Sequence, residues 1–194
     1  MDSGSAVLFV GTFAQQSPYG IRRPGLAAFA HYYGELMKSE EGDFNEAIAE
    51  FNHLIELNPK DAIAYYNRGL VEANKRDFDR AIADFNRAIQ LSPKFARAFN
   101  DRGSTKATMK EINGAIADFS HAIQLNPQFV QVYMNLGSVK AYSGDLDAAI
   151  ANFNQAVQLA PDSVEAYENL ASAKTRKGEY LLARAELKSL DKTH

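Results

Sequence analysis

The sequence predicts an all-α solenoid in which pairs of antiparallel helices stack along the chain. Its clearest feature is an internal repeat, because Pro59, Pro93, Pro127 and Pro161 stand 34 residues apart each time. A second observation is that apolar residues recur within each repeat at spacings of three and four, which is typical of helices that bury one face. Two helices of this length cannot enclose a core alone, so we expect neighbouring repeats to stack on one another.

Composition limits the classes of function. The chain has 194 residues, of which 46% are hydrophobic and 23% charged, so it can build a globular core. Its net charge of −3 does not favour a nucleic-acid partner. The absence of cysteine excludes disulfides, thiol catalysis and cysteine-based zinc sites. No apolar run approaches the roughly 18 residues that a membrane span needs.

Residues 1–25 do not follow the repeat. They contain an apolar run at residues 6–10, followed by five glycines and prolines that interrupt any long helix. An arm that packs on the first helices is one interpretation, and a signal peptide is the alternative. Asp2 precedes the apolar run without any basic residue, which disfavours export. A cytoplasmic location is therefore favoured over a periplasmic or otherwise exported one, and the sequence leaves the compartment open.

Residues 26–194 form the repeat domain, with five repeats that begin near residues 28, 62, 96, 130 and 164. In the expected second helix of each repeat, positions 20, 24 and 27 fall on one face, so we predict that they are buried. The residues at position 20 are Ala47, Ala81, Ala115, Ala149 and Ala183. Those at position 24 are Phe51, Phe85, Phe119, Phe153 and Leu187, and those at position 27 are Leu54, Ala88, Ala122, Ala156 and Leu190.

The first helix of each repeat carries a recurring glycine at position 8. A glycine inside a helix costs about 1 kcal/mol relative to alanine, so its recurrence predicts a helix crossing too close to admit a Cβ atom. These residues are Gly69, Gly103 and Gly137, with Ala171 in the fifth repeat. An aromatic residue recurs at position 4, as Tyr65, Phe99, Tyr133 and Tyr167.

An acidic residue recurs where each second helix is expected to begin. The positions are Asp43, Asp77, Glu111, Asp145 and Glu179. Such a side chain can cap free N–H groups and meets the positive end of the helix dipole. We therefore predict a turn before each of these residues.

The fifth repeat exchanges three apolar columns for polar residues. It carries Arg184, Asp191 and Thr193 where the earlier repeats carry isoleucine, valine or leucine. A repeat with nothing stacked beyond it needs a solvated outer face. We therefore expect this repeat to act as a C-terminal cap.

These columns resemble those of the tetratricopeptide-repeat (TPR) family, over roughly residues 26–190. In the second repeat the matching residues are Tyr65, Gly69, Ala81, Phe85, Ala88 and Pro93. The resemblance implies a right-handed superhelical solenoid that binds other proteins. It carries strong information on the fold and little on the individual partner.

The sequence gives no sign of catalysis. The four histidines, His31, His53, His121 and His194, lack the spacing of three to five residues that suits a metal on a helix. The sequence contains neither a glycine-rich phosphate loop nor a nucleophile elbow. We therefore expect no enzymatic activity, no cofactor and no metal.

The resemblance implies a concave groove lined by the first helices. In the second repeat the groove residues would be Ile63, Tyr66, Asn67, Leu70 and Asn74. In the third they would be Arg97, Asn100, Asp101 and Ser104. In the fourth they would be Gln131, Met134, Asn135, Ser138 and Tyr142, and in the fifth Glu165, Glu168 and Asn169.

Position 6 of the first helices carries short polar side chains, at Asn67, Asp101, Asn135 and Asn169. They could bond an extended peptide backbone, or they could simply suit a helix surface. The family's carboxylate clamp for heat-shock chaperone peptides is disfavoured, because Asp101 would repel a carboxylate where that clamp needs a charged donor.

We therefore predict a non-enzymatic adaptor or scaffold that binds a peptide or helix of a partner protein in the groove. The expected groove changes from apolar at Ile63, Tyr66 and Leu70 to acidic at Glu165 and Glu168, which suits an amphipathic, partly basic segment. The alternative is a homo-oligomer in which residues 1–25 occupy their own or a neighbour's groove.

Overall fold

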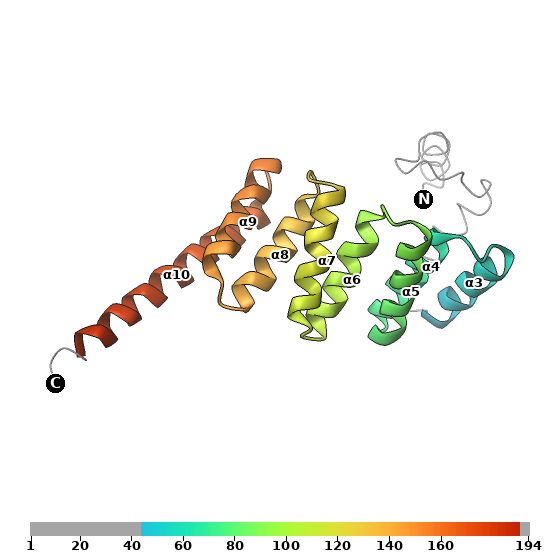
Figure 1. Cartoon of the computed structure of the whole chain (residues 1–194), viewed down its shortest axis with the longest axis horizontal. Helices are drawn as coiled ribbons and strands as arrows, with labels where there is room; N and C mark the ends of the chain where they lie inside the picture. Colours follow the sequence, from blue (N-terminus) through green and yellow to red (C-terminus); the bar gives the residue numbers. More distant parts are fainter. Residues whose placement is uncertain (1–43, 191–194) are drawn as a thin grey trace, which may run out of the picture. The chain divides into compact units, whose positions relative to one another are not determined.

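The structure is a computed structural model that describes residues 44–190, and at residue 46 and residues 181–190 it describes the backbone alone. Every regular element within residues 44–190 is an α-helix (Figure 1). The helices are α3 (Phe44–Leu57), α4 (Ala62–Asn74), α5 (Phe78–Leu91), α6 (Ala96–Thr108), α7 (Ile112–Leu125), α8 (Val130–Tyr142), α9 (Leu146–Leu159) and α10 (Val164–Leu190). The predicted all-α class is confirmed. The arm at residues 1–25 and the first helix of repeat 1 lie outside the described residues.

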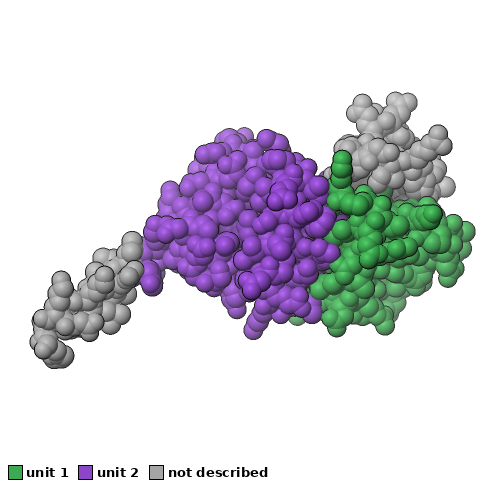
Figure 2. Space-filling model, viewed as in Figure 1, with its two compact units in different colours: residues 1–95 green, residues 96–194 purple. Residues whose placement is uncertain are grey.

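The chain divides into two compact units (Figure 2). In unit 1, residues 1–95, helix α4 packs against both α3 and α5. In unit 2, residues 96–194, successive helices pack pairwise from α6 to α10, and α8 also contacts α6 and α10. The first helices of the third, fourth and fifth repeats therefore lie next to one another in unit 2.

Among the described side chains, the predicted core columns are buried except at Leu54, which is half-buried and packs against the cluster of unit 1. The alanines at position 20 and the phenylalanines at position 24 in repeats 1 to 4 are almost completely excluded from solvent, as are the alanines at position 27 in repeats 2 to 4. In unit 1, Ala47 and Phe51 of α3 form one cluster with Ala64 and Val71 of α4. The columns are thus packing positions, as their spacing predicts.

The recurring glycines make room for the phenylalanines. A Cβ atom built on Gly69 or Gly103 would lie 2.9 Å from the ring of Phe85 or Phe119, respectively. At Gly137 the distance to the ring of Phe153 would be 2.7 Å. Real Cβ atoms do not approach aromatic carbons this closely, so the prediction of a helix crossing without room for a side chain is confirmed.

Replacing Gly137 with alanine should therefore destabilise the protein. Overpacking a filled core costs about 1–3 kcal/mol, which exceeds the roughly 1 kcal/mol that alanine gains in helix propensity. Gly178 is the matched control, because it is also helical and a Cβ atom there would meet nothing within 4 Å. In urea denaturation we expect Gly137→Ala to lower the unfolding midpoint and Gly178→Ala to leave it unchanged or raise it. Equal effects of the two would contradict the close-packing account.

The acidic residues that precede the second helices do not all act as caps. The Asp145 carboxylate accepts a hydrogen bond of 3.2 Å from the Ala148 N–H, which together with Lys140 lowers the pKa of Asp145. Asp77 and Glu111 make no such side-chain bond. Asp77 forms an ion pair with Arg80 instead, at 3.4 Å. The capping prediction is therefore confirmed at Asp145 and wrong at Asp77 and Glu111.

The fifth repeat differs from the expected helix pair. Helix α10 runs without a break through Glu179, where a second helix was predicted to begin. In each of repeats 2 to 4 the turn before the second helix contains one residue with a positive φ angle. These residues are Arg76, Lys110 and Gly144, respectively. Gly178 occupies the same column and remains helical. The prediction of a turn before Glu179 is therefore wrong.

Two side chains attach α10 to neighbouring helices at this point. Arg176 Nη2 donates a hydrogen bond of 3.2 Å to the Ala141 carbonyl oxygen in α8. Lys177 forms an ion pair with Asp147 at the start of α9. Both contacts attach the residues just before Gly178 to neighbouring helices. The polar columns behind the cap prediction lie among side chains that the structure does not describe, so the cap stays a prediction.

Candidate interaction face

The first-helix face of unit 2 consists of the predicted groove residues on α6, α8 and α10. Exposed side chains on this face are Arg97, Gln131, Ser138, Tyr142, Glu165 and Glu168. Half-buried side chains are Asp101, Ser104, Asn135 and Asn169. Because α8 contacts both α6 and α10, these helices bring their residues onto adjoining surfaces. The structure therefore places most of the predicted groove residues of unit 2 where another molecule can reach them.

A hydrogen-bond network joins α6 and α8 on this face. Asn135 Nδ2 donates to Asn100 Oδ1 at 2.9 Å and to Ser104 Oγ at 3.4 Å. Asn100 Nδ2 donates in turn to Asp101 Oδ1 at 2.8 Å, and Gln131 Nε2 donates to Asn135 Oδ1 at 3.1 Å. The network fixes the amide of Asn135 between the two helices, and it ends at the surface at Gln131.

Two predicted groove residues are buried instead. Asn100 is the inner member of the network, and Met134 packs in a cluster with Ala156 of α9 and Ala166 of α10. The small alanines leave a space that the flexible methionine side chain fills. Met134 therefore stabilises the core of unit 2, and its substitution would test stability before it tested binding.

In unit 1 the predicted groove residues are mostly involved in packing. The Tyr66 ring lies 4.7 Å from the Phe95 ring and 6.0 Å from the Phe85 ring, measured between centroids. Ile63 packs against the cluster of Ala47, Phe51, Ala64 and Val71. Asn67 and Leu70 are half-buried and Asn74 is exposed. The apolar residues Ile63 and Tyr66 are therefore half-buried and contribute to the packing of unit 1.

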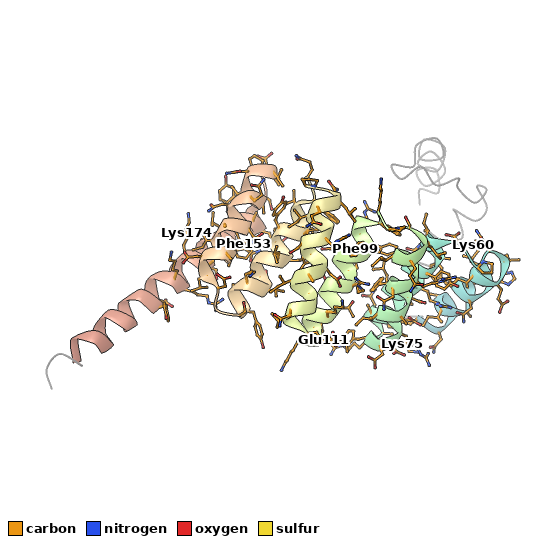
Figure 3. All side chains as sticks on the ribbon, in the orientation of Figure 1. Lys60, Lys75, Phe99, Glu111, Phe153 and Lys174 are labelled. Carbon is orange, nitrogen blue, oxygen red and sulfur yellow. The ribbon has the colours of Figure 1, made fainter. Side chains whose placement is uncertain are left out.

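Sequence reasoning missed a cluster of charged side chains between α6 and α7. Arg102 Nε donates to Asp118 Oδ2 at 2.9 Å and Arg102 Nη2 donates to Asp118 Oδ1, so the guanidinium binds the carboxylate in a bidentate manner. Lys106 Nζ lies 2.8 Å from Asp118 Oδ2. The side chains of α6 and α7 are drawn as sticks in Figure 3. The side chains of Arg102, Lys106 and Asp118 are all largely excluded from solvent. Two cations thus neutralise one buried carboxylate.

The equivalent cluster in unit 1 has a different composition. Arg68 donates to both oxygens of Asp84, at 2.6 and 2.7 Å, and also to Asn52 Oδ1 at 2.6 Å. The bond to Asp84 raises the pKa of Arg68. The third member is Glu72, which takes the place of Lys106. A second carboxylate therefore faces Asp84 where the third repeat has a cation.

Glu72 is the most perturbed titratable group among residues 44–180. Its side chain is 5% exposed, and Oε2 has no hydrogen-bond partner among the described residues. Burial, followed by the negative charge of Asp84, raises the pKa of Glu72 to about 7, and the positive charge of Arg68 opposes this shift. Glu72 is therefore protonated in a substantial fraction of molecules near neutral pH.

A signal for these clusters is present in the repeat columns. Position 7 is Arg68 and Arg102 where position 23 is Asp84 and Asp118. In the fourth repeat both charges disappear together, because position 7 is Leu136 and position 23 is Asn152. Comparing pairs of columns, instead of single columns, would have indicated the contact.

The described residues contain no group of three or more metal-ligating side chains. No helix within that part of the chain is long and apolar enough to cross a membrane. The polar groups on the first-helix face are amides, hydroxyls and separate charges, which recognise other molecules through hydrogen bonds and charge.

Several solved structures share this fold. MamA from Desulfovibrio magneticus RS-1 is 21% identical, with 81% of this chain and 90% of that chain covered and a TM-score of 0.67. YrrB, described as a TPR protein with an unusual peptide-binding site, is 22% identical, with 76% of each chain covered and a TM-score of 0.62. The first TPR domain of Spaghetti, bound to the HSP90 peptide SRMEEVD, is 20% identical, with 60% of this chain and 93% of that chain covered and a TM-score of 0.59.

Comparison of the sequence with curated proteins gave no match. Models of the tetratricopeptide repeat match residues 39–94 and 96–129, and a TPR repeat model matches residues 137–178. All three describe repeats, and none describes a catalytic family. Repeat solenoids of this kind present extended surfaces to other proteins. The helix pairs, their glycine and phenylalanine packing and these matches agree, and the chain belongs to the tetratricopeptide-repeat family.

Proposed function

We propose that this protein is a non-enzymatic adaptor, and that the first-helix face of unit 2 binds a peptide or helical segment of a partner protein. The observation that carries the proposal is the hydrogen-bond network that ends at Gln131. It holds the Asn135 amide in a fixed position on an accessible surface. A fixed polar group loses little conformational entropy when a ligand binds, so it can contribute to affinity and orientation.

The chemistry of this face suits a polypeptide. Gln131 uses one amide hydrogen within the network, which leaves its carbonyl oxygen and second amide hydrogen to pair with a peptide backbone. Tyr142, farther along α8, is exposed and offers a large apolar ring with a polar end. Backbone pairing and an aromatic contact are together typical of peptide recognition.

The charge on α10 indicates which end of the ligand is basic. Glu165 and Glu168 are both exposed in the first two turns of this helix. Charges arranged in this way steer a partner of opposite charge and set its orientation. We therefore expect lysine or arginine in the part of the ligand that lies over α10.

Two proteins with the same fold support a peptide ligand. YrrB is described as having a peptide-binding site, and the Spaghetti domain is bound to a peptide. That peptide, SRMEEVD, is acidic. In this chain Asp101 and the two glutamates of α10 would repel such a ligand, so we propose a neutral or basic segment instead.

The test is a selection of peptides on the full chain, followed by measurement of their affinity for two matched variants. Gln131→Arg places a long cation in the network on α8, and Gln124→Arg makes the same change at an exposed site on the second helix α7. We expect the first variant to weaken binding about tenfold or more, which corresponds to about 1.4 kcal/mol, and the second to leave the dissociation constant unchanged.

Thermal melts of both variants provide the control, since each change is on the surface and should leave stability within about 0.5 kcal/mol of the parent. The proposal is contradicted if the selected peptides bind Gln131→Arg as tightly as the parent. It is also contradicted if the two variants lose affinity equally.

A further inference from the structure

Helix α10 separates two surfaces that the other repeats bring together. In repeats 2 to 4, position 8 of the first helix contacts position 24 of the second helix, as in the pair Gly137 and Phe153. In the fifth repeat these positions are Ala171 and Leu187. They lie 16 residues apart on one continuous helix, and at 1.5 Å per residue this corresponds to about 24 Å. The two cannot meet within such a helix.

The identities of these two residues nevertheless fit one another. The fifth repeat has alanine where the others have glycine, and leucine where the others have phenylalanine. The larger residue on one helix is thus matched by the smaller residue on the other. Such compensation is expected when two positions fill one space, because a packed core tolerates exchanges that keep its total volume.

The surface that should receive the second helix is open. Ala171 is exposed, whereas its counterparts Gly69, Gly103 and Gly137 are buried. Tyr167 is 50% exposed, while Phe99 in the same column is 8% exposed and lies against the His121 ring of its own repeat's second helix.

The segment that should cover this surface begins with an exposed apolar residue. Tyr180 is 59% exposed. Its counterparts Phe44 and Leu146, each at the start of a second helix, pack against core clusters. Ala171 and Tyr180 are therefore both available to another molecule.

We propose that a second copy of this chain supplies the missing contact, with residues 179–190 of each copy packed on the Ala171 surface of the other. The chain itself carries both size-matched residues, Ala171 and Leu187, so a second copy can supply each of them. Helix α10 is continuous across Gly178, which keeps the two surfaces of one copy apart. Exchange of an identical element between two copies is a low-cost route to a dimer. This inference does not depend on the proposed partner-binding function.

Disulfide trapping tests the exchange, because the natural chain has no cysteine. The full chain with Ala171→Cys and Leu187→Cys should form a covalent dimer under oxidising conditions, at about twice the 21.4 kDa mass of one chain. The matched control pairs Ser172→Cys with Leu187→Cys, since Ser172 is exposed on the adjoining face of the helix. We expect about tenfold less covalent dimer from the control, because cysteines whose Cα atoms are more than about 7 Å apart do not bridge.

A disulfide within a single chain would overturn the proposal, because it would show that residues 179–190 fold back on their own copy. Free thiols in both variants, or equal dimer from both, would also overturn it. Adding Gly178→Ala to the first variant opposes a turn at this position and favours a straight helix. The covalent dimer should survive this addition, and its loss would contradict an exchange through a straight α10.

Discussion

Asp118→Ala should lower the free energy of unfolding by about 3–5 kcal/mol, the usual cost of removing one member of a buried ion pair. The change leaves the guanidinium of Arg102 and the ammonium of Lys106 together in a largely water-excluded site without their shared carboxylate. Urea denaturation followed by circular dichroism measures the effect. Glu111→Ala, at an exposed acid in the same repeat, should change the unfolding free energy by less than about 0.5 kcal/mol.

The fourth repeat offers a rescue for this loss. It carries Leu136 and Asn152 at the two positions, so the double variant Arg102→Leu with Asp118→Asn copies a combination that the chain already uses. The double variant removes one cation together with the carboxylate, and the fourth repeat keeps a lysine, Lys140, in the column of Lys106 beside this combination. We expect the double variant to recover more than half of the stability lost in Asp118→Ala. Full stability in Asp118→Ala itself would show that the ion pair contributes nothing.

Glu72→Gln should stabilise the protein at pH 8 by roughly 2–3 kcal/mol and have little effect at pH 4.5. The pKa of Glu72 is raised to about 7 in the folded state, above the 4.5 of a free side chain, so the folded state binds the proton more tightly than the unfolded state. The penalty for a charged Glu72 is absent below pH 4.5 and complete above pH 7. Stability should therefore fall between these values in the parent.

Three charged groups act on Glu72, namely Asp84 and Asp77, which raise its pKa, and Arg68, which lowers it. Asp84 faces Glu72 from α5, and the Asp84 carboxylate forms an ion pair with Arg68. Asp79→Asn, at an exposed acid in the first turn of α5, is the control and should not remove the fall in stability. Unfolding free energies measured at several pH values test whether the ionisation of Glu72 lowers stability. Parallel pH profiles for Glu72→Gln and the parent would contradict this role of Glu72.

The packing of this fold could be predicted because the same packing residues recur in each repeat. Three independent copies place glycine opposite phenylalanine, and the structure shows the rings of Phe85, Phe119 and Phe153 at the glycine backbones. A periodic pattern of this kind reports contacts that every repeat makes. The helix pairs and the core columns in residues 44–180 follow from it.

Features that differ between repeats could not be predicted in the same way. Met134 was assigned to the groove by its position, but its apolar side chain packs against Ala156 and Ala166. The continuous α10 was missed because Gly178 occupies the column in which Arg76, Lys110 and Gly144 form the turns of the earlier repeats. The residues of the first-helix face of unit 2 were named from their columns, but the hydrogen-bond network through Asn100 and Ser104 was not predicted.

The central claim is that partners bind the first helices of unit 2, and site-specific photocrosslinking tests it most directly. A photoreactive amino acid at Gln131 or Glu168 should attach to a selected peptide, and one at Gln124 on α7 should not. Mass spectrometry of the crosslinked products identifies the attached residue. Crosslinks from Gln131 and Glu168 with none from Gln124 are the predicted result, and crosslinks from Gln124 alone would place the ligand on the second helices and contradict the claim.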